Sequence, residues 1–172
     1  MTPALQRRHV SAALAGLALH LGAGLSSTLS PAWAKESALP IPDSLPAIAT
    51  AAARQAEPLI LLISLPGCPY CELVRRNYLL AALADGLPVW QINMKDQQRP
   101  LVGFDGNFSH AAEQITRWKV RLAPTVLFLS AHGQALAQPL VGIASVDFYG
   151  AYLDERIATA RQAIGGVSSK RV

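Results

Sequence analysis

The chain has 172 residues, of which 51% are hydrophobic and 15% are charged, and its formal net charge at pH 7 is +4. The basic residues are scattered rather than gathered in a block, so the charge pattern excludes a nucleic-acid-binding protein. The length predicts a single domain with one hydrophobic core.

Residues 1–34 have the three parts of a signal peptide: the basic pair Arg7 and Arg8, an apolar run over 10–25, and small residues that end at Ala34. The apolar run is shorter than the roughly 20 residues of a membrane-spanning helix. We therefore expect cleavage near Ala34, a periplasmic or otherwise secreted protein, and no stable membrane insertion afterwards. The paired arginines also fit twin-arginine export, but the residues that follow them favour the general secretory route.

Proline and apolar patterns predict the elements of the first half of the mature chain. Leu59–Ser64 is a continuous apolar run, typical of a strand buried on both faces of a sheet. In order, we expect an extended lead-in over 35–45, a helix over Ala47–Gln55 capped by Ser44 or Leu45, a strand over Leu59–Ser64, and a helix from Cys68 that ends before Gly86 and Pro88.

The second half predicts three more strands, the last two joined by a tight turn, and two helices. Pro139 places the last strand at a sheet edge, because proline lacks the amide hydrogen that a central strand needs. In order, we expect a strand over Pro88–Met94, a loop over Lys95–Phe108, a helix over His110–Lys119 capped by Ser109, strands over Thr125–Leu129 and Ala135–Val141, a helix over Ser145–Ile164 that buries Tyr149, Leu153, Ile157, Ala160 and Ile164, and a mobile tail over 165–172. The predicted domain spans 46–164.

The two cysteines, Cys68 and Cys71, lie three positions apart in a chain predicted to reach an oxidising compartment. A structural disulfide that closes so small a ring would stabilise the fold little, which leaves redox chemistry or metal binding. Cys68 begins a helix, where backbone amides and the helix dipole favour the thiolate. Cys68 is therefore the predicted nucleophile and Cys71, one turn later, the resolving cysteine, while Pro69 and Tyr70 between them tune the redox equilibrium.

The order of elements, the Cys-Pro-Tyr-Cys motif at a helix start and the Ala123-Pro124-Thr125 segment together resemble the thioredoxin superfamily. The resemblance implies an α/β fold with a central mixed four- to five-stranded sheet flanked by helices. It implies thiol-disulfide exchange that needs no cofactor or metal besides the redox-active disulfide. It also implies a cis Pro124, substrate contacts at Ala123, Thr125 and Gly142, and a site shaped by Gly67, Pro69, Tyr70 and Pro124.

Two positions depart from thioredoxin. Leu62 replaces its buried aspartate and Gln91 replaces the lysine beside that aspartate, so a buried charge pair is lost as a unit. We expect Glu72 to be a weak substitute for the missing base, and Arg75 to be a plain surface charge. The Pro-Tyr pair resembles that of glutaredoxins, although 141–144 lacks their glutathione-binding residues.

The predicted function is periplasmic thiol-disulfide exchange, with reduction of protein disulfides ahead of oxidation. The predicted partners are protein disulfides or dithiols and a membrane electron donor, and the protein is predicted to be a monomer. The alternatives are a thiol oxidase or isomerase of the same fold, a copper(I)-binding module in which Met94, His110 or His132 assists the thiolates, and a non-catalytic chaperone or adaptor. The loop over 95–108 either contacts substrate at the rim of the site or is an insertion with Phe104 tucked inside.

Overall fold

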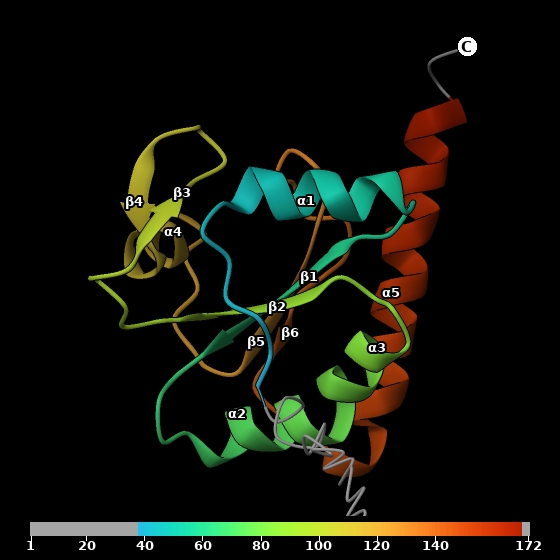
Figure 1. Ribbon diagram of the computed structural model, residues 1–172. Coiled ribbons are helices and arrows are strands. Elements are labelled where there is room, and N and C mark those ends of the chain that lie inside the picture. Colours follow the sequence, from blue (N-terminus) through green and yellow to red (C-terminus); the bar gives the residue numbers. More distant parts are fainter. Residues whose placement is uncertain (1–37, 170–172) are drawn as a thin grey trace, which may run out of the picture. The chain divides into compact units, whose positions relative to one another are not determined.

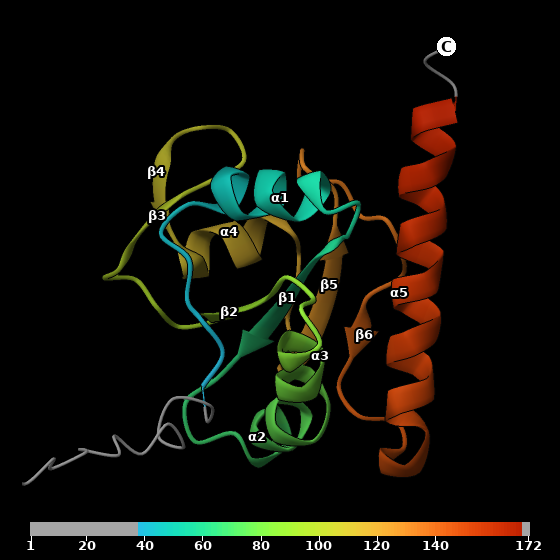
Figure 2. The same cartoon turned by 45° about the vertical axis from the view of Figure 1, so that its right-hand side comes forward.

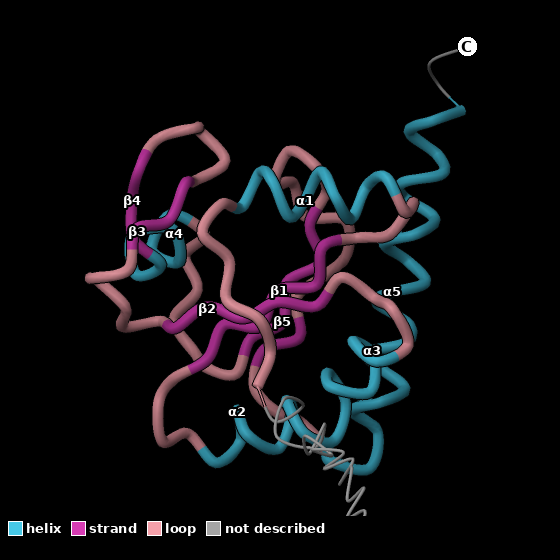
Figure 3. The backbone as a smooth tube through the Cα atoms, viewed as in Figure 1, coloured by secondary structure: helices cyan, strands magenta, loops and turns pink. Residues whose placement is uncertain are grey.

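The computed structural model describes residues 38–169, and Figures 1 and 3 show its helices arranged around a central group of strands. The predicted signal peptide and its cleavage near Ala34 lie outside the described residues. In chain order the elements are α1 (Leu45–Arg54), β1 (Leu59–Ser64), α2 (Pro69–Val74), the π-helix η2 (Arg75–Leu79), α3 (Leu80–Ala84), β2 (Val89–Asn93), β3 (Pro100–Val102), β4 (Phe108–His110), α4 (Ala111–Arg117), β5 (Thr125–Leu129), β6 (Leu140–Val141) and α5 (Val146–Ser169).

The central sheet has four strands in the order β2-β1-β5-β6. Strand β2 runs parallel to β1, whereas β5 runs antiparallel to both of its neighbours, β1 and β6. The sheet is therefore mixed, which confirms the predicted α/β fold with a four- to five-stranded sheet flanked by helices. The same strand order and directions characterise the thioredoxin fold that the sequence resembles.

Strand β1 is the centre of the molecule because its side chains alternate between two cores. Ile60 and Leu62 belong to one cluster, and Leu59, Leu61 and Ile63 belong to the other, all of them 0% exposed. The first cluster lies under α5 and the helical run from α2 to α3, and the second lies under α1 and α4, on the opposite side of the sheet (Figure 2). Each such side chain contributes roughly 1.5–3 kcal/mol by leaving water.

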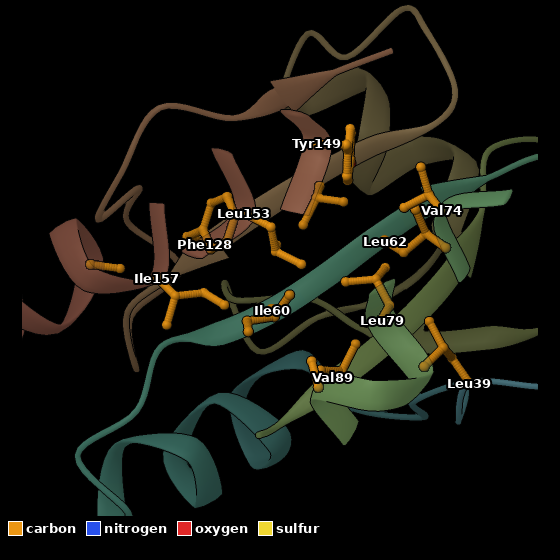
Figure 4. Close-up of a cluster of buried hydrophobic side chains, with 13 residues drawn as sticks. Leu39, Ile60, Leu62, Val74, Leu79, Val89, Phe128, Tyr149, Leu153 and Ile157 are labelled. Carbon is orange, nitrogen blue, oxygen red and sulfur yellow. The ribbon is translucent and has the colours of Figure 1, made fainter. Parts of the chain in front are cut away.

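The first cluster packs α5 against the helical run that starts at Cys68, as the close-up in Figure 4 shows. Four of the five residues predicted to be buried on α5 are buried, and Ile164 is half-buried. The Tyr78 ring lies 4.9 Å from the Tyr149 ring, measured between centroids, and the Tyr78 hydroxyl donates a hydrogen bond to the Val146 carbonyl at 2.7 Å. The helical run that starts at Cys68 is thus anchored to the start of α5.

The predicted loop over Lys95–Phe108 is wrong in part, because it contains the antiparallel hairpin β3–β4. The hairpin follows β2 after a short loop, and its residue Val102 forms an isolated parallel β-bridge with Ser44 at the start of α1. Phe104 is half-buried and its ring centroid lies 6.4 Å from that of Trp118, so the interpretation of an insertion with Phe104 tucked inside is the one that the packing favours.

The predicted cap of α4 is also wrong. Ser109 lies in β4, where its hydroxyl donates to the Glu113 carboxylate at 2.9 Å, and His110 is the N-cap residue with no side-chain cap bond. At α1 the structure decides between the two predicted caps, because Ser44 is the N-cap and its side chain accepts from the Ala47 amide at 3.4 Å.

The last predicted strand is at the sheet edge, as expected, but it is shorter than Ala135–Val141. Only Leu140 and Val141 form β6, with one isolated bridge between Leu129 and Ala135, so Pro139 is outside the ladder. Helix α5 continues to Ser169 and includes the start of the predicted tail. Among the helices within residues 38–169, none has the length and apolarity that a membrane crossing requires.

Candidate active site

A tight turn carries the chain from β1 into the helix that bears the cysteines. The Cys68 amide donates to the Leu65 carbonyl at 3.4 Å, and Gly67 has a φ of 69°. This left-handed conformation is costly for residues with a Cβ atom, which explains a glycine immediately before the first cysteine. The predicted shaping role of Gly67 thus has a local conformational basis.

Cys68 is the N-cap residue of α2, and its sulfur accepts a hydrogen bond from the Cys71 amide at 3.1 Å. The two cysteines form a disulfide, with their Cα atoms 5.3 Å apart. Pro69 occupies the first helical position, where its missing N–H would have no partner in the helix anyway. The sulfur of Cys68 therefore lies at the positive end of the helical run, where a thiolate is stabilised.

The two cysteines differ in burial. Cys71 is 0% exposed, whereas Cys68 is half-buried. Pro69 is exposed and Tyr70 has 63% of its surface exposed, so both stand at the surface beside Cys68. Cys68 is thus the more exposed of the two cysteines.

The segment around Pro124 borders the turn from the β5 side. Thr125 pairs with Ile63 near the end of β1, and continuing that register places Pro124 opposite Ser64 at the start of the active-site turn. The Ala123–Pro124 peptide bond is cis, and Pro124 and Thr125 are buried. The Thr125 hydroxyl donates to the Leu122 carbonyl at 2.8 Å.

Two backbone features of this border bear on substrate contact. The Gly142 amide donates to the Pro124 carbonyl at 2.8 Å, and Gly142 has a φ of 66°. The structure therefore brings three of the predicted residues, Pro124, Thr125 and Gly142, together beside the end of β1. Ala123 is half-buried, and its backbone N–H and C=O form no backbone hydrogen bond with any part of the chain between residues 38 and 169.

A charged network borders the opposite side of Cys68, and sequence reasoning missed it. The register confirms that Leu62 and Gln91, which replace the thioredoxin charge pair, are direct neighbours on β1 and β2. Arg75 was expected to be a plain surface charge, which is wrong: its side chain is only 16% exposed. Its guanidinium donates to Gln91 Oε1 at 2.9 Å, to Ser64 Oγ at 3.2 Å, and to the carboxylate of Glu72.

A shallow depression beside the disulfide connects this network to Cys68. Its lining residues are Leu65, Pro66, Gly67, Cys68, Pro69, Glu72 and Arg75. Since Glu72 and Arg75 follow Cys68 by four and seven residues, one and two helical turns place them on the same face as Cys68. No residue of the β3–β4 hairpin lines this depression.

Within the described range, no group of three or more His, Cys, Asp or Glu side chains is placed to hold a metal ion. Met94 packs against the core cluster under α1, and His110 caps α4. His132 lies in the turn after β5. None of these three residues, which were considered as additional copper ligands, lines the depression beside Cys68.

No protein-family model and no curated protein matches the chain. Solved structures with a similar fold include a thioredoxin h from poplar, at 19% identity over 62% of this chain and 82% of that chain with a TM-score of 0.43. They also include the periplasmic thioredoxin SoxS from Paracoccus pantotrophus, at 22% identity over 59% and 96% of the two chains with a TM-score of 0.39. A third is the C-terminal domain of DsbD from Neisseria meningitidis, at 15% identity over 64% and 90% with a TM-score of 0.44.

Similarity to solved structures at such low sequence identity carries no information about activity. The fold is identified here by strand order, strand direction and register. Residues 38–169 have a thioredoxin-like α/β fold that carries a Cys-x-x-Cys disulfide at the start of a helix.

Proposed function

We propose that the protein is a thiol-disulfide oxidoreductase that exchanges disulfides through Cys68 and Cys71. The observation that carries the proposal is the asymmetry of the pair: a half-buried cysteine at a helix N-cap is joined to a cysteine that is 0% exposed. A purely structural disulfide needs no such asymmetry, whereas exchange requires one attacking and one protected thiol.

In the reducing direction the Cys68 thiolate attacks a substrate disulfide and forms a mixed disulfide, and the first substrate sulfur leaves as a thiolate that takes up a proton. Cys71 then loses its proton and attacks the Cys68 sulfur, which releases the second substrate thiol and closes the Cys68–Cys71 disulfide. Two electrons pass from the cysteine pair to the substrate, whose two leaving thiolates take up two protons: the one that Cys71 releases and one from solvent, where Cys68 lost its own on ionising. A dithiol donor restores the reduced pair by the same two steps.

The border formed by β5 and β6 is the proposed docking side for the substrate. The backbone of Ala123 is available to pair with an extended segment, while Thr125 and Gly142 hold the Pro124 segment in place. Tyr70 and Pro69 add exposed apolar surface next to Cys68. This arrangement suits protein disulfides in flexible segments, because pairing through the backbone does not depend on one side-chain sequence.

We further propose that the mature protein begins near Lys35, acts in the periplasm or another exported location as a monomer, and reduces protein disulfides with electrons from a membrane donor. Support for export comes from the residues of the first 34 positions. Support for reduction comes from the size of the domain, because residues 38–169 include one thioredoxin-like sheet and no inserted helical subdomain.

The test is the equilibrium reduction potential of the exported protein in glutathione buffers, with Cys68→Ser and Cys71→Ser variants as controls. We expect a reversible two-electron couple that both variants abolish, and mass spectrometry should find an N-terminus near Lys35. A potential near that of thioredoxin, about −270 mV, supports the reductase. A value well above about −200 mV supports an oxidase or isomerase instead. If no reversible disulfide forms, the proposal is wrong and copper(I) binding by the two thiolates becomes the better hypothesis.

A further inference from the structure

Arg75 stands at the junction of the active-site helix and the sheet, on the side of Cys68 that faces β2. It is the first residue of the π-helix η2, and it borders two adjoining depressions. One depression contains Cys68 and Glu72, and the other extends to Gln91 on β2. A residue that borders both is in a position to influence the cysteine through space.

The contacts of Arg75 hold its charge in one place. Gln91 and Ser64 accept hydrogen bonds from two different nitrogens of the guanidinium, at 2.9 Å and 3.2 Å, and Glu72 accepts from the third. Since only 16% of the side chain is exposed, water screens this charge less than it screens a charge at the open surface. Arg76 also pairs with Glu72, but its side chain is 64% exposed.

The depression that contains Cys68 is lined by two charged side chains. Among the residues that border the two depressions, Glu72 and Arg75 are the charged ones, and the neighbours from β1, β2 and the lead-in, Ser64, Asn93 and Ile41, are neutral. The carboxylate of Glu72 opposes a negative charge on the Cys68 sulfur, and the guanidinium of Arg75 favours one. The balance between these two charges therefore affects how stable the reduced protein is when Cys68 is a thiolate.

We propose that Arg75 is a positioning residue for the redox couple: held by Gln91 and Ser64, it offsets the charge of Glu72 and favours the Cys68 thiolate, which sets how oxidising the Cys68–Cys71 pair is. This inference rests on the proposed thiol-disulfide exchange. Reduction of the disulfide consumes two electrons and two protons, or one proton fewer where Cys68 remains a thiolate. Stabilising that thiolate stabilises the reduced protein and makes the disulfide a stronger oxidant.

The sign of the effect separates this role from a structural one. Arg75→Met leaves the Glu72 carboxylate near Cys68 without its buried partner, so the variant should be less oxidising than the native protein. Glu72→Gln removes the opposing charge and should make the protein more oxidising. A residue that only stabilises the fold has no reason to shift the two variants in opposite directions.

The experiment measures the equilibrium constant with glutathione and the pH profile of Cys68 alkylation by iodoacetamide for each variant, all made in the full chain. We expect Arg75→Met to change the equilibrium constant about fivefold, which is ~20 mV at 29.6 mV per tenfold, and to move the alkylation profile to higher pH. Glu72→Gln should move both quantities the other way. Arg76→Gln is the matched control, with the same charge change on the same helix, and should have less than half the effect of Arg75→Met.

Two further variants keep the test decisive if Arg75→Met unfolds. Arg75→Lys retains the charge and should keep most of the native potential, and Gln91→Met frees the guanidinium and should shift the potential in the direction of Arg75→Met. Equal potentials in the native protein, Arg75→Met and Gln91→Met would overturn the inference while leaving the exchange chemistry intact. Loss of the reversible disulfide in the native protein would instead refute the proposed function.

Discussion

Replacing Gly67 with alanine tests whether the turn before Cys68 is as constrained as its backbone indicates. Gly67 has a φ of 69°, and an added Cβ atom would meet no heavy atom within 4 Å, so the whole cost of the substitution lies in the backbone. A left-handed conformation costs an L-residue about 1–2 kcal/mol, and the stiffer unfolded chain returns about 0.4–1 kcal/mol. We therefore expect Gly67→Ala to lower the free energy of unfolding by about 1 kcal/mol.

Urea unfolding of the oxidised protein measures this difference, which corresponds to a midpoint shift of about 0.5 M at an unchanged slope. Gly86→Ala is the matched control, because Gly86 has a φ of 88° and equally open space but lies at the far end of the helical run. Both variants should lose similar stability, and because the site keeps its shape, neither should change the equilibrium constant with glutathione more than about threefold. A neutral or stabilising Gly67→Ala would refute the left-handed turn.

Three other predictions concern the scaffold. The Arg117 guanidinium and the Asn107 amide lower the pKa of Asp105 from 3.8 to about 2, so its contribution to stability is present above pH 3.8 and lost as the pH falls towards 2. Asp105→Asn should therefore make the free energy of unfolding, followed by circular dichroism, depend less on pH between about 4 and 2. Leu153→Ala, at a residue 4% exposed on the core-facing side of α5, should cost about 2–5 kcal/mol in urea unfolding, and a cost below 1 kcal/mol would contradict the packing of α5. Ser44→Ala removes the cap of α1 and should cost about 1 kcal/mol in the same assay, whereas Ser44→Gly should cost only a few tenths.

The elements that the sequence predicted well are those in which every residue points to the same structure. Leu59–Ser64 matches β1 residue for residue, because a short continuous apolar run is typical of a strand that is buried on both faces of a sheet. The Cys-Pro start of α2 was equally clear, because proline at the first helical position and a capping side chain before it are local signals. Local patterns thus located both the central strand and the cysteine pair.

The hairpin was missed because its strands have three residues each, too few for an alternating pattern to show. A signal was nevertheless present, since Asp105-Gly106 is a pair typical of tight hairpin turns. The end of α5 was predicted too early for a different reason: Gly165 and Gly166 each cost a helix about 1 kcal/mol, which a long helix can absorb.

Arg75 was misjudged because its partners are remote in sequence. Gln91 lies 16 residues away and Ser64 lies 11 residues away on the other side, and neither spacing is visible as a periodic pattern. From the sequence, the replacement of the charge pair by Leu62 and Gln91 was interpreted as removing all buried charge near the cysteines. The structure instead places a guanidinium from the helix against Gln91, so a charge remains near the cysteines although it comes from a different element.

The two borders of Cys68 differ in chemistry, and that difference predicts separable functions. The β5 side presents the backbone of Ala123, which makes no backbone hydrogen bond within residues 38–169, whereas the β2 side presents the paired charges of Glu72 and Arg75. Ala123→Leu adds bulk only to the first border. It should therefore slow reduction of a protein disulfide about tenfold or more while leaving the reduction potential and the reduction of a small disulfide such as oxidised glutathione unchanged.

Arg75→Met is the converse variant, because it should shift the potential and alter both disulfide substrates by a similar factor. The assay is a comparison of second-order rate constants for one protein disulfide and one small disulfide in the native protein and the two variants. If Ala123→Leu slowed both substrates equally, the β5 side would not be the docking side for polypeptide, and the available backbone at Ala123 would have to be explained by packing alone.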